Sequence, residues 1–266
     1  MKILKNILNK LTLFCLACFP ALLVTPTAAS QEQSDRPIRV AVFSDDGSGT
    51  SRFNFMAALI KSERFDDFEI IQMSAESIRE GGLKNVDVLV NPGGSGSKQA
   101  RSLKEEGREE VRNFIGGGGG FLGICAGAYM ATNQYSWSLN LIDAQVVSRE
   151  HWARGTGMVD IKFTPAGQEF FNINQEMGEV YFGQGPLLAP NPEDDPLVPN
   201  FECLATYASE IAENGAPKGV MVGTSALVRS QFGNGRVLVF SAHPEKTDSL
   251  DYIIEGAVRW VANVDQ

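Results

Sequence analysis

The chain has 266 residues, 43% of them hydrophobic, which is enough for one α/β domain with a sizeable core. Its 32 acidic and 23 basic side chains give a net charge of −9, which disfavours nucleic acids and anionic membrane surfaces as partners. With two histidines and no H-E-x-x-H pattern, we expect no metal site, and no cofactor motif is evident.

The first thirty residues differ from the rest of the chain. Three lysines precede an apolar run over residues 11–24, and small residues follow over 25–30. This pattern predicts a signal peptide over 1–30, then a flexible leader over 31–37, so we expect an exported, periplasmic or secreted protein without membrane contact after cleavage. An uncleaved anchor is the alternative, but about 14 apolar residues are short for a membrane span.

Strands and helices alternate after the leader. Buried strands are predicted over 38–43, 68–73, 86–90 and 120–124, and helices over 52–61, 75–79 and 99–115. Such alternation predicts a mostly parallel, flavodoxin-like sheet with helices on both faces. The glycine-rich loops all follow strands, so we expect them to meet at the carboxyl edge of the sheet.

The second half is less regular. Residues 139–204 are interpreted as an irregular insertion that covers this edge, with strand-like stretches at 141–147 and 178–182, a helix from Pro165 to Phe171 and a loop over 186–199. Strands over 219–231 and 236–241 form a predicted hairpin, and a helix over 249–261 closes a single domain of residues 38–264.

Cys125 stands at the end of the fourth strand within G-x-C-x-G, the thiol counterpart of the G-x-S-x-G nucleophile elbow. Glycines at 123 and 127 allow a sharp strand-to-helix turn that presents the thiol at the carboxyl edge. The other interpretation is a buried structural cysteine. Cys15 and Cys18 lie in the predicted signal peptide, so only Cys203 accompanies Cys125 in the rest of the chain, and a bridge between these two would disable the elbow.

A thiol nucleophile requires a base, and the base an orienting acceptor. His243 follows an apolar strand at the same edge, with Glu245 two residues later, and we prefer it to His151, which lies in the irregular region beside Glu150. An oxyanion hole requires two backbone N–H groups, for which we choose Ala126 and Gly94. Gly93 is an alternative to Gly94, although these glycines also suit a tight turn.

The segments Gly123–Tyr129 and Ser241–Glu245 together resemble the class I glutamine amidotransferase-like superfamily, and within it the family of the biotin–protein ligase N-terminal domain. The resemblance extends over residues 38–262 and includes 91–94 and 180–186. It implies a Cys-His-Glu triad of Cys125 as nucleophile, His243 as base and Glu245 as orienter.

One departure concerns the substrate. Glutamine-hydrolysing members of the superfamily usually carry glutamine four residues after the cysteine, where this chain has Tyr129. We therefore predict a hydrolase that acts on a small-molecule amide or acyl compound, with Gly93, Tyr129 and Gln184 as candidate substrate-binding residues. A non-catalytic binding module that retains the pocket and a cysteine peptidase are the alternatives, and a homo-oligomer is possible.

Overall fold

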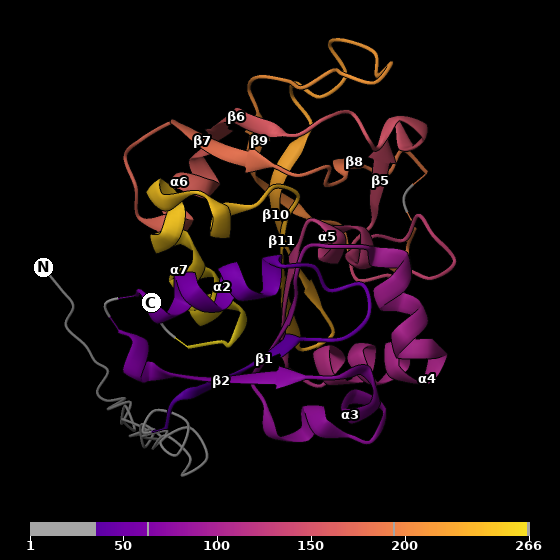
Figure 1. Ribbon diagram of the computed structural model, residues 1–266, viewed down its shortest axis with the longest axis vertical. Coiled ribbons are helices and arrows are strands. Elements are labelled where there is room, and N and C mark those ends of the chain that lie inside the picture. Colours follow the sequence, from indigo (N-terminus) through magenta and orange to yellow (C-terminus); the bar gives the residue numbers. More distant parts are fainter. Residues whose placement is uncertain (1–35, 63, 194, 265–266) are drawn as a thin grey trace, which may run out of the picture. The chain divides into compact units, whose positions relative to one another are not determined.

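A computed structural model describes residues 36–62, 64–193 and 195–264 (Figure 1). The predicted signal peptide and residues 31–35 of the leader lie outside the described residues. The strands are β1 (Ile38–Phe43), β2 (Phe68–Met73), β3 (Val88–Asn91), β4 (Gly120–Ile124), β5 (Ala144–Val147), β6 (Gly157–Phe163), β7 (Met177–Phe182), β8 (Leu187–Pro190), β9 (Glu202–Tyr207), β10 (Ser225–Phe232) and β11 (Gly235–Phe240). The α-helices are α2 (Ser51–Ile60), α3 (Ala75–Arg79), α4 (Gly96–Gly116), α5 (Ala126–Ala131), α6 (Pro165–Phe171) and α7 (Asp251–Val261).

Five strands form the parallel half of the sheet in the order β2-β1-β3-β4-β11. This is the strand order of flavodoxin-like folds, and it confirms the fold class predicted from the sequence. The inner strands β1, β3, β4 and β11 are mostly apolar because both of their faces are covered, whereas the edge strand β2 exposes Glu69 and Gln72. In β1, Val40 and Val42 belong to one core cluster while Ala41 and Phe43 belong to another, as the two-residue period of a strand requires.

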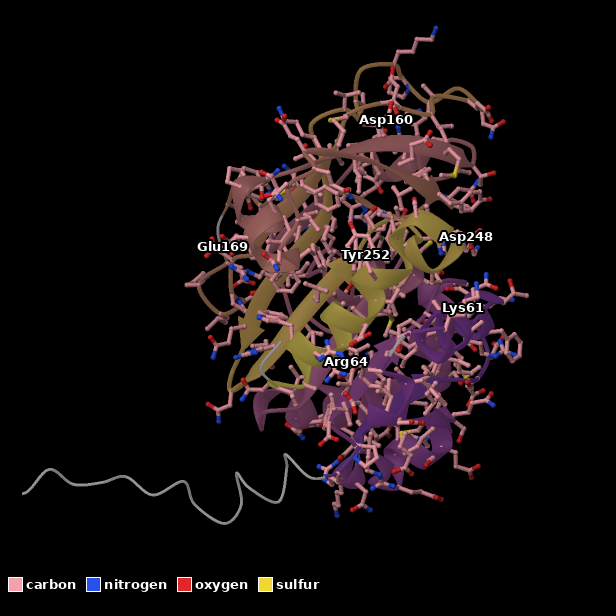
Figure 2. All side chains as sticks on the ribbon, turned by 90° about the vertical axis from the view of Figure 1, so that its left-hand side faces the viewer. Lys61, Arg64, Asp160, Glu169, Asp248 and Tyr252 are labelled. Atoms are coloured by element: carbon pink, nitrogen blue, oxygen red, sulfur yellow. The ribbon has the colours of Figure 1, made fainter. Side chains whose placement is uncertain are left out.

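Helices cover both faces of this half (Figure 1). The first cluster includes residues of α2, α6 and α7, and the second includes residues of α3, α4 and α5. Figure 2 shows Lys61, which follows α2, beside Asp248, with 4.0 Å between Lys61 Nζ and Asp248 Oδ1. No helix in the described ranges is both long and apolar enough to span a bilayer.

The region 139–204 corrects the sequence-based expectation of an irregular insertion. It supplies β5, β6, β7 and β8, and with β9 and β10 these strands form an antiparallel half that continues the sheet beyond β11. The strand β6 alternates buried residues (Val159, Ile161, Phe163) with exposed ones, so its signal was a two-residue period and not an apolar run. The expected loop over 186–199 also begins with a strand, β8.

The loops at the carboxyl edge are joined by backbone hydrogen bonds. Gly49 N–H donates to Gly93 O at 2.9 Å, and Ser95 N–H donates to Gly47 O at 2.8 Å, which ties the loop after β1 to the loop after β3. Cys125 N–H donates to Phe240 O at 2.8 Å, which ties the end of β4 to the end of β11. Four chain segments therefore meet around Cys125.

Candidate active site

Cys125 occupies a strained turn between β4 and α5. Its φ of 51° and ψ of −92° lie outside the regions that non-glycine residues normally adopt. A Cβ at Gly123 would lie 2.8 Å from Gly127 O, and a Cβ at Gly127 would lie 2.1 Å from Asn91 O. Both glycines are therefore required by close backbone packing, which forces the turn and presents the thiol, as in a nucleophile elbow.

His243 and Glu245 come from the segment that follows β11. The imidazole Nδ1 lies 2.7 Å from Glu245 Oε1, and both side chains are almost completely buried. A carboxylate is an acceptor only, so Nδ1 carries the donated proton and Nε2 remains for another partner. Cys125 lies near enough to the imidazole to raise its pKa. The structure thus brings together the three residues that were expected to act together.

Ser51, at the start of α2, links this pair to the glycine loop. Its hydroxyl donates to Glu245 Oε1 at 2.7 Å and accepts from Gly93 N–H at 2.9 Å. The carboxylate is thereby held by two donors on one oxygen, while Glu245 Oε2 has no hydrogen-bond partner in the described part of the chain. Ser51 was not predicted, because no local pattern connects it with Glu245, 194 residues away.

Two glycines enclose the imidazole. A Cβ at Gly93 would lie 2.5 Å from His243 Cε1, and a Cβ at Gly183 would lie 2.5 Å from His243 Nε2. Gly183 also accepts a 3.4 Å hydrogen bond from Cys125 Sγ through its carbonyl. Tyr181, at the end of β7, fixes this segment because its carbonyl accepts from His243 N–H at 2.9 Å. The ring has almost no freedom to rotate.

The charge state of His243 follows from these neighbours. Burial acts to lower the pKa of the imidazole, but the Cys125 sulfur and the Glu245 carboxylate act in the opposite direction and together raise this pKa to about 10. The structure therefore favours an imidazolium beside the sulfur at neutral pH.

Candidate oxyanion donors lie next to the sulfur. Ala126 is the first residue of α5, and neither its N–H nor that of Gly94 has an acceptor within the described ranges. Gly94 has a φ of 145°, and a Cβ there would lie 2.1 Å from Gly47 O. Its backbone is thus held in place by the loop after β1, with the N–H not used by the fold.

The thiol lies where two lobes of a cleft meet. Cys125, Gly94 and Gly183 line both of them. The larger lobe, about 370 Å³, is otherwise lined by Ser95, Gly96, Ser97, Tyr129, Tyr135, Trp137, Trp152 and Gln184. The smaller lobe, about 230 Å³, is otherwise lined by Gly49, Thr50, Ser51, Gly93, Thr156, Tyr181, His243 and Lys246. One lobe is aromatic and the other carries the histidine and a lysine.

Tyr129 and Gln184, two candidate substrate-binding residues, meet in the aromatic lobe. The Tyr129 hydroxyl donates to Gln184 O at 3.3 Å, and Gln184 has a φ of 69°. Burial raises the pKa of Tyr129, and the nearby Cys125 raises it further, so the phenol stays neutral. Gly93, the third candidate, lines the other lobe.

His151, the alternative base, and Cys203, the possible disulfide partner of Cys125, lie outside the cleft. His151 contacts Ser148 and Glu150, at 3.0 and 3.2 Å from its Nδ1, and does not line either lobe. Cys203 is free, as is Cys125, and its sulfur donates to Ala205 O at 3.3 Å. Within the described ranges no three His, Cys, Asp or Glu residues are placed to hold a metal ion.

Comparisons with known proteins agree with the resemblance inferred from the sequence. Residues 38–153 match the family model described as "Biotin-protein ligase, N terminal". No match was found among curated protein sequences. The resemblance to the biotin–protein ligase N-terminal family is thereby confirmed over residues 38–153.

Solved structures share the fold at low sequence identity. A putative ThuA-like protein from Bacteroides uniformis ATCC 8492 aligns with a TM-score of 0.57 and 12% identity over 85% of this chain and 92% of its own. The β-galactosidase from Bacillus circulans sp. alkalophilus aligns with a TM-score of 0.55 and 16% identity over 86% of this chain but only 31% of its own. A cytoplasmic protein from Salmonella typhimurium aligns with a TM-score of 0.52 and 9% identity over 84% of this chain and 98% of its own.

Proposed function

We propose that this chain, which has a class I glutamine amidotransferase-like fold and the biotin–protein ligase N-terminal signature, is a hydrolase of C–N amide bonds that uses Cys125 as its nucleophile. The observation that carries the proposal is the buried His243–Glu245 pair beside a thiol held at positive φ in a cleft. Strain of this kind costs roughly 1–3 kcal/mol and persists where the position of the side chain matters.

The reaction has two halves. The Cys125 sulfur attacks the amide carbon, and the C–N bond breaks as His243 gives a proton to the leaving nitrogen, which leaves an acyl-thioester and a free amine. Water then attacks the thioester, His243 takes a proton from it, and the carboxylic acid leaves as the thiol is restored. Glu245 accepts from Nδ1 of His243 and holds the imidazole in the orientation and tautomer that this exchange needs.

Negative charge develops on the amide oxygen in both halves. Ala126 follows the nucleophile in the chain and Gly94 lines both lobes together with Cys125, and we assign their N–H groups as the donors to this oxygen. One such donor typically contributes about 3–4 kcal/mol to transition-state stabilisation. Position 94 requires glycine because a Cβ there would lie 2.1 Å from Gly47 O. The same close contact holds the N–H of Gly94 in place.

The direct test compares two cysteine variants. We expect Cys125→Ala to lower hydrolysis of a panel of small amides by at least about a thousandfold, while Cys203→Ala, a matched change at a free cysteine outside the cleft, leaves it unchanged. Alkylation by iodoacetamide at pH 6, located by peptide mass spectrometry, should modify Cys125 at least about tenfold faster than glutathione. Reaction of Cys125 at or below the glutathione rate would contradict a nucleophilic role.

A non-catalytic binding module is the second candidate. It is favoured by the contact from Cys125 Sγ to Gly183 O, since a thiol that donates to a carbonyl is protonated. In that case the aromatic lobe would hold a ligand and Cys125→Ala would leave binding intact. Slow alkylation of Cys125, together with a small molecule that copurifies with both wild type and Cys125→Ala, would support this candidate.

We further propose that the protein is exported, on the basis of the lysine-rich start and apolar run that precede residue 31. Expression of the full chain followed by cell fractionation should place the protein outside the cytoplasm. Its intact mass should match a chain that begins near residue 31. A cytoplasmic protein that retains residues 1–30 would contradict the proposal.

A further inference from the structure

The cleft is free of acidic side chains in a protein that is acidic overall. The chain carries 32 aspartates and glutamates, yet no described residue that lines either lobe is one of them. The charged groups that do line the cleft are Lys246 and the imidazolium of His243, both in the smaller lobe. The cleft therefore suits an anionic ligand better than a cationic one.

Arg154 adds a buried positive charge at this site. Its residue surface is 1% exposed, and its terminal nitrogens Nη1 and Nη2 have no hydrogen-bond partner in the described part of the chain. A guanidinium buried without a partner is costly, so natural proteins rarely retain one unless it has a use. Within the described residues no oxygen accepts from these two nitrogens, and although the charges of Glu210 and Glu150 act on the guanidinium, burial outweighs them and lowers its pKa.

The position of Arg154 connects it with the cleft. In the chain it stands two residues after Trp152, which lines the aromatic lobe, and two residues before Thr156, which lines the histidine lobe. Its charge acts on the hydroxyls of Tyr129 and Tyr207, and the Cys125 sulfur acts on the same two hydroxyls. Arg154 and the thiol therefore approach the same pair of tyrosines.

We propose that Arg154 binds a carboxylate of the substrate, so that the amide cleaved by Cys125 belongs to an acidic compound. The proposal rests on the hydrolase function proposed above. The two free donors form the planar fork that pairs with both oxygens of a carboxylate. Lys246, whose Nζ lies 5.2 Å from the centre of the Tyr181 ring, supplies a second cation at the opposite lobe and attracts the same ligand.

Contact with the guanidinium requires a small displacement, because Arg154 does not itself line the cleft. Trp152 is the side chain placed for this movement. It is 56% exposed, lies two residues before Arg154, and shares a segment with Gly155 and Gly157, which have φ values of 109° and 158°. A ligand that moves Trp152 and this segment would reach the guanidinium from the aromatic lobe.

The test uses two reagents that differ in charge alone. Iodoacetate and iodoacetamide both form a thioether with the cysteine sulfur and release iodide, but only iodoacetate carries a carboxylate. We expect the iodoacetate-to-iodoacetamide rate ratio at Cys125 to exceed that of glutathione by about tenfold, a typical effect of nearby cations. Arg154→Met should lower this ratio at least about threefold, and Arg154→Lys should restore part of it; the ratio corrects for any change in the intrinsic reactivity of the thiol.

A stability measurement separates ligand binding from a structural role. Because the guanidinium is unpaired, we expect Arg154→Met to leave the thermal midpoint unchanged or to raise it. Arg259 is the matched control, since it is also buried but bonds to Glu255 at 2.9 Å and to Asp67. Arg259→Met should lower the midpoint. A lowered midpoint for Arg154→Met as well would show that Arg154 supports the fold.

The outcomes for the two proposals are distinct. A wild-type rate ratio equal to that of glutathione, and unchanged by Arg154→Met, overturns carboxylate binding even if iodoacetamide reacts rapidly with Cys125. Slow reaction of Cys125 with both reagents contradicts its role as a nucleophile. The rate ratio, and its change in Arg154→Met, still decides whether Arg154 binds a carboxylate.

Discussion

At the scale of single residues, the geometry around Cys125 and His243 depends on glycines, which have no side chain and let the backbone come close. Gly123 and Gly127 permit the turn that holds Cys125, while Gly93 and Gly183 leave room for the imidazole on both sides. The positions of the sulfur and the ring are thus set by backbone contact, which is stiffer than contact between flexible side chains. A single methyl group at one of these glycines should separate the two groups.

Gly183→Ala tests this directly. The new Cβ would lie 2.5 Å from His243 Nε2, so the imidazole must shift away from Cys125 or the β7 segment must move. We expect the iodoacetamide rate at Cys125 to fall by about ten- to a hundredfold, which is the usual cost of a misplacement near 1 Å. Gly178→Ala in β7 is the control, because its Cβ would meet nothing closer than 3.4 Å. Equal rates in the two variants would contradict the steric argument.

The sequence was sufficient to propose Cys125, His243 and Glu245 because each belongs to a short local pattern at the end of a strand. It was insufficient for Ser51, Gly183 and Arg154. Ser51 reaches Glu245 across 194 residues, and Gly183 reaches Cys125 across 58. Such contacts depend on how strands are ordered in the sheet, and that order is not written in any one segment.

At the scale of elements, the buried parallel strands were the predictable part. The ranges of β1, β2 and β4 and of the helix α3 agree with the sequence-based expectation, since each of these strands is rich in apolar residues and is bounded by polar or glycine residues. The strands β6 and β9 were missed. They lie in the antiparallel half, where half of the side chains face outward and an apolar run is absent.

Asp143 holds two segments of this region together. Its buried carboxylate accepts from Asn133 Nδ2 at 2.7 Å, from Asn191 Nδ2 at 2.9 Å and from Asp195 N–H at 2.7 Å. The segment after Asn133 carries Tyr135 and Trp137, whose rings stack at 4.5 Å in the aromatic lobe. The carboxylate therefore connects the aromatic wall to the segment that follows β8.

Asp143→Asn should destabilise the protein in a pH-dependent way. Burial acts to raise the pKa of Asp143, but its three donors outweigh burial and lower this pKa below its ordinary value. The ionised carboxylate thus contributes stability above its unfolded pKa of about 3.9, and this contribution is lost as pH falls through the lower folded pKa. In urea titrations we expect the free energy of unfolding of Asp143→Asn to be lower than that of wild type by about 2–3 kcal/mol at pH 7. This difference should become smaller below about pH 4.

Asp160→Asn is the control for this measurement. Asp160 is exposed on β6. Figure 2 shows it at a distance from Lys61 and Tyr252. Its replacement should change the free energy of unfolding by less than about 0.5 kcal/mol at either pH. A loss for Asp143→Asn that stays constant down to pH 3 would show that the ionised form is not what stabilises the fold.

At the scale of the whole molecule, two electric fields compete at the thiol. The net charge of −9 repels anions at long range, whereas Lys246, Arg154 and the imidazolium attract them locally. Salt screens both fields, but it screens exposed, distant charges more completely than buried, close ones. The sign of the salt effect on an anionic reagent therefore reveals which field governs access to Cys125.

We expect the local cations to prevail. Raising KCl from about 20 to about 500 mM, which shortens the screening length from roughly 20 to 4 Å, should slow alkylation of wild type by iodoacetate at least about twofold. The iodoacetamide rate should stay constant, because that reagent is neutral. In Arg154→Met/Lys246→Met only the imidazolium remains to oppose the repulsive field of the acidic surface, so salt should slow the iodoacetate reaction less than in wild type. An acceleration in wild type would mean that the acidic surface, and not the cleft, selects the charge of what reaches the thiol.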